Sequence, residues 1–212
     1  MKRKSRSARP EPGWELEESL WRRGYSPVVG IDEVGRGALA GPVIVAAVVL
    51  SYGDYSYADS KTLKPSLREQ LALHVREHAL AWAVGSASAS EIDRYNVLVA
   101  THMAASRALY ELPIPYQALV TDYLRLEATC PVVAVPKADS RSRQVAAASI
   151  LAKVTRDEHM VEMAADYPEY GFEKHKGYGS VEHLKALHRI GACHLHRRSF
   201  RPVVQRRLFE PS

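Results

Sequence analysis

Two nearly uninterrupted apolar runs stand near the start of the chain, VVGID at 28–32 and VIVAAVVL at 43–50. Runs of β-branched residues without polar alternation are typical of strands covered on both faces of a sheet. The glycine-rich stretch between them predicts a turn, so the two strands are expected to form a hairpin. Three shorter apolar runs predict further strands: LAWAVGSAS at 80–88, ALVTD at 118–122 and PVVAV at 131–135.

Apolar residues at helical spacing separate and follow these strands. One helix is expected to begin at the capping-box spacing of Ser66 and Glu69 and to continue through Leu71 and Val75. The other expected helices are 14–24 with a stop at Gly24, 90–112 ended by Pro113 and Pro115, 142–168, and 180–191 with a stop at Gly191. A hairpin followed by alternating helices and strands predicts an α/β domain with a mixed sheet.

Composition narrows the class of protein. A chain of 212 residues with 46% hydrophobic content suits one globular domain. The chain has a net charge of +5, and its basic residues crowd the two ends, in MKRKSRSAR and HLHRRSFRPVVQRR. This distribution favours a polyanionic partner. Two cysteines without metal-type spacing argue against a disulfide framework, and no apolar run approaches the ~20 residues that span a bilayer. We expect a cytoplasmic protein with no membrane partner.

Four carboxylates share one kind of position at the ends of the expected strands: Asp32, Glu33, Asp122 and Asp139. Sites in α/β sheets are usually built at one edge, so these acids are expected to converge. Convergent carboxylates repel unless a cation neutralises them, and Mg²⁺ takes oxygen ligands. Two such ions can activate a water and stabilise the leaving oxygen of a phosphodiester. Each acid alone has a simpler explanation as a turn former or salt-bridge partner.

The triplet Gly35, Arg36 and Gly37 follows the first acids directly. Glycine lets the backbone approach a ligand or adopt a positive φ, and arginine can reach phosphate. A plain tight turn is the alternative. Flexible backbone beside two carboxylates favours a substrate that amides and metals contact together.

GIDEVGRGALAGPVIVAAVVL, DSKTL, KADSRSRQVAAASILAKVTRD, HKGYGSVEHL and HRRSFRPV occur in that order. In order and spacing they resemble bacterial ribonuclease HII, the type 2 ribonuclease H, over roughly 14–204. The resemblance implies a ribonuclease H-like mixed β-sheet flanked by helices, with a helical C-terminal region. Residues 1–13 are then a flexible basic tail, 14–204 the catalytic domain, and 205–212 a C-terminal tail.

The implied activity is an endonuclease that cuts the RNA strand of RNA–DNA hybrids. It also incises 5′ of ribonucleotides embedded in duplex DNA, leaving 3′-hydroxyl and 5′-phosphate ends. The resemblance makes Asp32, Glu33, Asp122 and Asp139 both the catalytic and the metal-binding residues, for two Mg²⁺ or Mn²⁺ ions. The implied enzyme acts as a monomer.

The resemblance also implies substrate-binding residues. Gly35, Arg36 and Gly37 match the loop whose backbone contacts the ribose 2′-OH, the group that distinguishes RNA from DNA. Tyr178 matches a tyrosine that packs at the RNA-to-DNA junction. Lys61 matches a lysine near the substrate phosphate.

Some positions depart from the family pattern. Asp122 is followed by Tyr123 instead of the usual glycine, KAD replaces KGD, and RQV replaces LSI before AAAS. Asp157 competes as fourth acid, but ion pairing within its helix explains it sufficiently. Five histidines suggest a metal cluster, an interpretation ranked low without cysteine partners or an HEXXH spacing: His175, His183, His188, His194 and His196.

Two functional alternatives remain open beside ribonuclease HII. Ribonuclease HIII carries an extra N-terminal domain, and only 31 residues precede Asp32 here. A non-catalytic hybrid-binding protein would gain affinity for phosphate by losing these acids, so the presence of all four argues against it.

The C-terminus offers a further partner. Gln205, Leu208 and Phe209 resemble the QxxLF peptides that dock on sliding clamps, with packing of the tail on the body as the alternative.

Overall fold

A computed structural model describes residues 11–55, 57 and 64–207, with the side chains of 205–207 excepted. The elements are α1 (Glu15–Trp21), β1 (Val28–Val34), β2 (Val43–Val49), α2 (Pro65–His78), β3 (Ala81–Ala87), α3 (Ala89–Tyr95), α4 (Val97–Tyr110), β4 (Ala118–Asp122), β5 (Val132–Val135), η1 (Ala138–Ser140), α5 (Arg143–Asp166), η2 (Pro168–Tyr170), α6 (Phe172–His175), α7 (Val181–Ile190) and α8 (Arg201–Arg207).

One mixed sheet organises the molecule, in the order β3-β2-β1-β4-β5. β2 runs antiparallel to β1 and β3, whereas β4 is parallel to β1 and to β5. The expected mixed sheet and its leading hairpin are therefore confirmed. This topology brings the carboxyl ends of β1, β3, β4 and β5 to the same edge.

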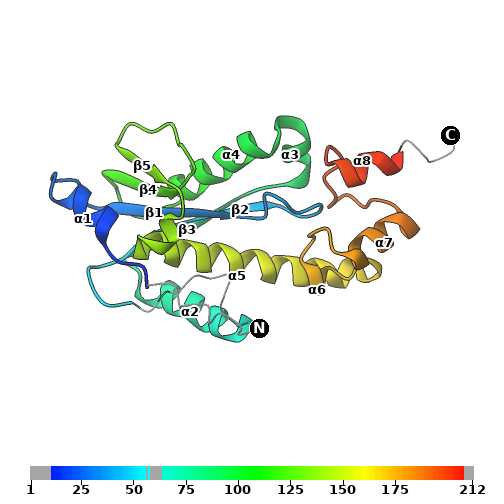
Figure 1. Cartoon of the computed structure of the whole chain (residues 1–212), viewed down its shortest axis with the longest axis horizontal. Helices are drawn as coiled ribbons and strands as arrows, with labels where there is room; N and C mark the ends of the chain where they lie inside the picture. Colours follow the sequence, from blue (N-terminus) through cyan, green and yellow to red (C-terminus); the bar gives the residue numbers. More distant parts are fainter. Residues whose placement is uncertain (1–10, 56, 58–63, 208–212) are drawn as a thin grey trace, which may run out of the picture.

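Helices cover both faces of the sheet, which lies between α4 and α5 in Figure 1. Alternate residues of β2 enter opposite cores: Val43 and Val45 pack toward alanines of α4, and Ile44 packs with Ile150 of α5. Every residue of β2 is buried, because neither face of this strand meets solvent. This burial on both faces explains why the strand is apolar throughout its sequence.

Two helix boundaries differ from the sequence prediction. The helix expected over 90–112 is divided at Asn96, whose φ of 70° ends α3 and whose Oδ1 accepts hydrogen bonds from the first amides of α4. The predicted capping box at Ser66 and Glu69 is wrong, since α2 begins at Pro65 and its N-cap, Lys64, makes no side-chain cap. The capping box lies instead at Ser88 and Glu91.

The C-terminal region, with α6, α7 and α8, gathers at the end of the molecule opposite α1 (Figure 1). Two fully buried arginines join it to the loop after β1. Arg156 of α5 donates to the carbonyls of Ala40 and Pro42 in that loop, at 3.0 and 2.9 Å, and to Lys176 O at 2.9 Å.

Arg197 makes the second set of bonds. Its guanidinium donates to Gly41 O at 2.9 and 3.0 Å and to Arg36 O at 2.9 Å. Burial, and then the positive charge of Arg156, lowers the pKa of Arg197 to about 9. In the described part of the chain, no helix is long and apolar enough to cross a membrane.

Candidate active site

The predicted acids lie at the sheet edge shared by the parallel strands. Asp32 and Glu33 belong to β1, and Asp122 ends β4. The register pairs Ile31 with Thr121, so the next residues, Asp32 and Asp122, are neighbours across the two strands. Asp32 is 8% exposed, and its side chain is hydrogen-bonded to Ser149 of α5.

Charge is poorly compensated at this edge. Burial, followed by the negative charges of Glu33 and Asp122, raises the pKa of Asp32 well above its usual value. Burial also raises the pKa of Glu33, against the opposing effect of Arg36, which lies 3.2 Å from Glu33 Oε1. Glu33 Oε2 is buried without a hydrogen-bond partner. These oxygen donors fit a hard divalent cation, which would neutralise them.

Asp139 is placed beside this group by a short 3-10 turn. It lies in η1 after β5 and is 8% exposed. The preceding amide, Ala138 N–H, donates to Asp122 Oδ1 at 3.2 Å, which docks the turn against the end of β4. Within 11–55, 57 and 64–207, however, no three His, Cys, Asp or Glu side chains are arranged around one point as metal ligands.

The loop after β1 is held tightly at its first glycine. Gly35 has a φ of +95°, and a Cβ there would lie 2.3 Å from Arg156 Nε and 2.8 Å from Pro42 O. Only glycine fits this position. Gly37 is exposed, with open space where a side chain would begin. The loop thus combines a fixed start with an accessible turn.

Tyr178 stands against the same loop. Gly177 O accepts hydrogen bonds from Leu39 N at 2.8 Å and Ala40 N at 3.2 Å. The half-buried Tyr178 ring has the Arg156 guanidinium carbon 5.1 Å from its centroid and Lys153 Nζ at 5.8 Å. The structure therefore brings the glycine loop and Tyr178 together. Lys61 lies outside the described residues.

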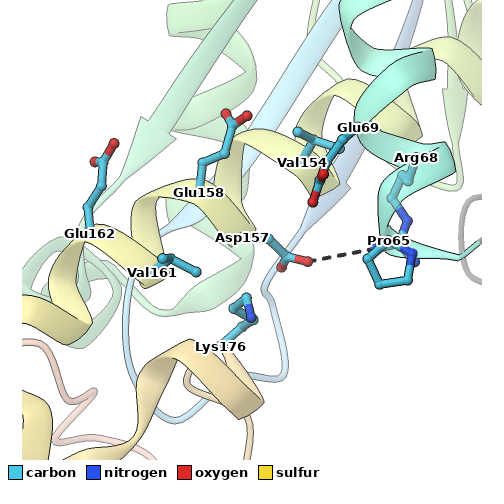
Figure 2. A pocket seen from close by; sticks show the side chains of 9 residues that line it. All are labelled: Pro65, Arg68, Glu69, Val154, Asp157, Glu158, Val161, Glu162 and Lys176. Atoms are coloured by element: carbon cyan, nitrogen blue, oxygen red, sulfur yellow. Dashed lines mark ion pairs between the residues drawn. The ribbon is translucent and has the colours of Figure 1, made fainter.

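Asp157, the competing fourth acid, is ion-paired with basic side chains of α5 and α2. Its carboxylate lies 2.6 Å from Lys153 Nζ and 3.7 Å from Arg68 Nη1. Figure 2 shows it pointing toward Arg68 in a pocket of about 420 Å³ between α2 and α5. The lining residues are Pro65, Arg68, Glu69, Val154, Asp157, Glu158, Val161, Glu162 and Lys176, none of them one of the four acids.

Sequence reasoning missed Arg156 and Arg197 as the residues that hold the loop. A signal for Arg156 exists: it lies four residues from both Ala152 and Met160 on the buried side of α5. A charged residue in an apolar helical stripe needs internal partners. Those partners, carbonyls about 115 positions earlier, are not visible in the sequence.

Comparisons with known proteins agree with this geometry. The family model described as Ribonuclease HII matches residues 29–203. Ribonuclease HII of Thermus thermophilus is 55% identical over 190 residues, covering 90% of this chain and 93% of the relative. Ribonuclease HII of Halalkalibacterium halodurans is 46% identical over 191 residues, covering 89% of this chain and 73% of the relative.

Among solved structures, ribonuclease H2 of Pyrococcus horikoshii superposes with a TM-score of 0.73 at 26% identity, covering 87% of this chain and 99% of that one. The expected ribonuclease H-like fold is confirmed. The family match over residues 29–203 extends from β1 into α8 and includes the four acids. The chain belongs to the ribonuclease HII family, and it is a ribonuclease H endoribonuclease.

Proposed function

We propose that this enzyme cleaves the RNA strand of RNA–DNA hybrids and also incises duplex DNA 5′ of an embedded ribonucleotide. Its products would carry 3′-hydroxyl and 5′-phosphate ends. The observation that carries the proposal is the group of carboxylates on β1 and β4, where burial and mutual repulsion raise the pKa of Asp32 and Glu33 and where Glu33 Oε2 is buried without a hydrogen-bond partner. Buried negative charge beside an exposed loop is costly unless it serves a cation that also contacts phosphate.

The four acids, Asp32, Glu33, Asp122 and Asp139, would hold two divalent cations, Mg²⁺ or Mn²⁺. Bound there, such ions supply an activated water and stabilise the leaving 3′ oxygen. The chain contributes the orientation of the acids: Ser149 holds Asp32, and the Ala138 amide holds Asp122. These two contacts restrain carboxylates that otherwise repel one another.

Recognition of the ribonucleotide is assigned to the loop and to Tyr178. The accessible backbone at Gly37 suits contact with a ribose 2′-OH, with Gly35 fixing the loop and Arg36 placed to reach phosphate. Tyr178 would pack on the deoxyribose side of the junction, and Lys61 would lie near the phosphate. The exposed basic residues favour the nucleic-acid backbone in general.

A sliding clamp is a proposed partner through Gln205, Leu208 and Phe209. The support is the QRRLF sequence, and these side chains lie outside the described residues. We place the enzyme in the cytoplasm as a monomer. A non-catalytic hybrid binder fits less well, because the four acids lower the affinity for phosphate without a cation.

The decisive experiment compares Asp32→Asn and Asp122→Asn with wild type on a duplex carrying one ribonucleotide, with and without Mg²⁺ or Mn²⁺. Each change removes a metal-binding charge, so cleavage should fall by about 10³-fold or more, equivalent to several kcal/mol of transition-state stabilisation. Binding of the duplex should persist. Mapping the cut should place it 5′ of the ribonucleotide.

The matched control is Asp54→Asn, which alters a carboxylate that is 93% exposed and follows β2, whose carboxyl end lies at the edge of the sheet opposite to the four acids. Wild-type rates are expected for this variant. Near-normal turnover by both Asp32→Asn and Asp122→Asn would refute the metal assignment, and a cut elsewhere would refute the incision site.

A further inference from the structure

Two buried histidines form a chain of hydrogen bonds beneath Tyr178. His183 of α7 is fully buried and His196 is 1% exposed. Their Nε2 atoms are 3.0 Å apart, and His183 Nδ1 is 2.9 Å from Tyr178 O. His196 Nδ1 is 3.1 Å from Cys193 N. The proposed nuclease function uses neither histidine.

The positions of the protons follow from the partners. Tyr178 O can only accept, so His183 Nδ1 carries a hydrogen. In a neutral imidazole the other nitrogen then accepts, and His196 Nε2 must be the donor to His183. His196 Nδ1 is left as acceptor for the Cys193 amide. The chain therefore runs in one direction, from Cys193 N–H to Tyr178 O.

Packing prevents the His183 ring from turning away. The His175 ring is stacked on it, with centroids 4.4 Å apart and planes 10° apart. Phe172 meets it edge to face at 5.5 Å. The neighbouring Gly177 carbonyl accepts from the amides of Leu39 and Ala40 in the loop after β1, and Tyr178 O also accepts from Ser180 N at 2.8 Å. His183 is thus the side chain that connects a rigid aromatic cluster to the backbone of Tyr178.

We propose that His183, held as a donor by His196, is a positioning residue that sets the orientation of Tyr178 and so favours single embedded ribonucleotides over long hybrids. The inference rests on the proposed junction role of Tyr178. The physical reason is that His183 Nδ1, together with Ser180 N, fixes the direction of the Tyr178 carbonyl, and the Tyr178 ring is carried by the same residue. A shift of that peptide plane moves the ring relative to the loop after β1, whose Leu39 and Ala40 amides are bonded to the preceding carbonyl, Gly177 O.

Two substitutions separate hydrogen bonding from packing. His183→Asn places an amide nitrogen near the position of Nδ1 and retains the donor to Tyr178 O. His183→Gln reaches the position of Nε2 and loses that donor. Both remove the ring, so a purely structural role predicts equal effects.

The readout is the ratio of kcat/KM on a duplex with one ribonucleotide to kcat/KM on a long RNA–DNA hybrid, with kcat and KM measured separately. His183→Gln should lower this ratio by about 3- to 10-fold, the loss of one neutral hydrogen bond. His183→Asn should stay within about twofold of wild type. Tyr178→Ala provides the reference loss.

The outcomes are distinguishable. If Tyr178→Ala leaves the ratio unchanged, the junction role fails and the inference falls with it. If Tyr178→Ala lowers the ratio but Asn and Gln at 183 act equally, only the inference is overturned.

A measurement on the wild type tests the proposed histidine tautomers even if the variants do not fold. Nitrogen-15 NMR of the histidines should find His183 protonated at Nδ1 and His196 at Nε2, both neutral near pH 7. The opposite tautomer of His183 would overturn the proposal.

Discussion

His196 is the titrating residue whose burial has the clearest consequence for stability. Burial, and then the nearby His183, lowers its pKa to about 4. The groups that face it are His183, His175, Arg198, the Cys193 amide and thiol, and the rings of Tyr170 and Phe172. In the unfolded chain its pKa is near 6.5, so between pH 6.5 and 4 the folded state binds fewer protons than the unfolded state.

The stability contributed by neutral His196 should therefore be present above pH 6.5 and lost as the pH falls toward 4. The full loss is on the order of 3 kcal/mol. Asp32 and Glu33 act in the opposite sense, because their raised pKa values make the folded state bind more protons. The test therefore compares the pH dependence of the unfolding free energy between the wild type and a variant without the His196 ring.

His196→Gln retains a donor toward His183 and removes the titrating ring. Urea unfolding of both proteins from pH 7 to pH 4 should show the wild type losing stability relative to the variant as the pH falls. A difference that stays constant across this range would contradict the assignment. Because His196→Gln preserves the donor, it should not alter substrate preference.

At the same scale, the sequence predicted some site residues better than others. Asp32, Glu33 and the glycine loop are adjacent in the chain, so one short motif was enough to propose a joint role for them. Arg197 could not be found in this way, since its partners are carbonyls 156 and 161 positions earlier. Contacts between backbone and distant side chains leave no local pattern.

Between elements, the contact of β3 with α4 depends on a glycine. A Cβ at Gly85 would lie 2.1 Å from Ala104 O and 2.5 Å from Ala108 N, both backbone atoms of the helix. Gly85→Ala should therefore destabilise the fold by about 3 kcal/mol, because neither backbone can move without disturbing the core.

The comparison variant is Gly13→Ala, where the added Cβ meets nothing within 4 Å. Its change in unfolding free energy should stay within about 0.5 kcal/mol. Both values come from urea unfolding followed by circular dichroism. Equal stability of the two variants would show that α4 and β3 are not packed this closely.

Strands and most helices were predictable because each has its own apolar pattern. The residues at which helices begin were less predictable. Ser66 and Glu69 have capping-box spacing, yet Pro65 already occupies the first helical position. The division at Asn96 was also missed. A helical pattern continues across it, and only the positive φ and the side-chain cap reveal the break.

Across the whole molecule, the proposed clamp peptide adds a second macromolecular partner to a net positive chain. Replacing Leu208 and Phe209 together by serine should reduce capture on immobilised clamp protein by about tenfold or more, as for loss of apolar anchors at an interface. Incision of a short duplex without clamp should not change.

Glu210→Ala serves as the control, because it alters the same tail without removing the anchors. If the double variant is captured as well as wild type, the clamp assignment is wrong. A lower unfolding temperature of the double variant would favour the alternative, in which the tail packs on the body.

The two arginines that hold the glycine loop have a consequence for the order in which the enzyme is made. Chains emerge from the ribosome N-terminus first, and early segments begin to fold before later ones exist. Gly41 O accepts its hydrogen bonds from Arg197, which is synthesised 156 residues later. The sheet and its acids can assemble while that partner is still unsynthesised. A nascent chain would thus possess the proposed metal-binding acids before it possesses the fixed loop that we propose contacts the ribose.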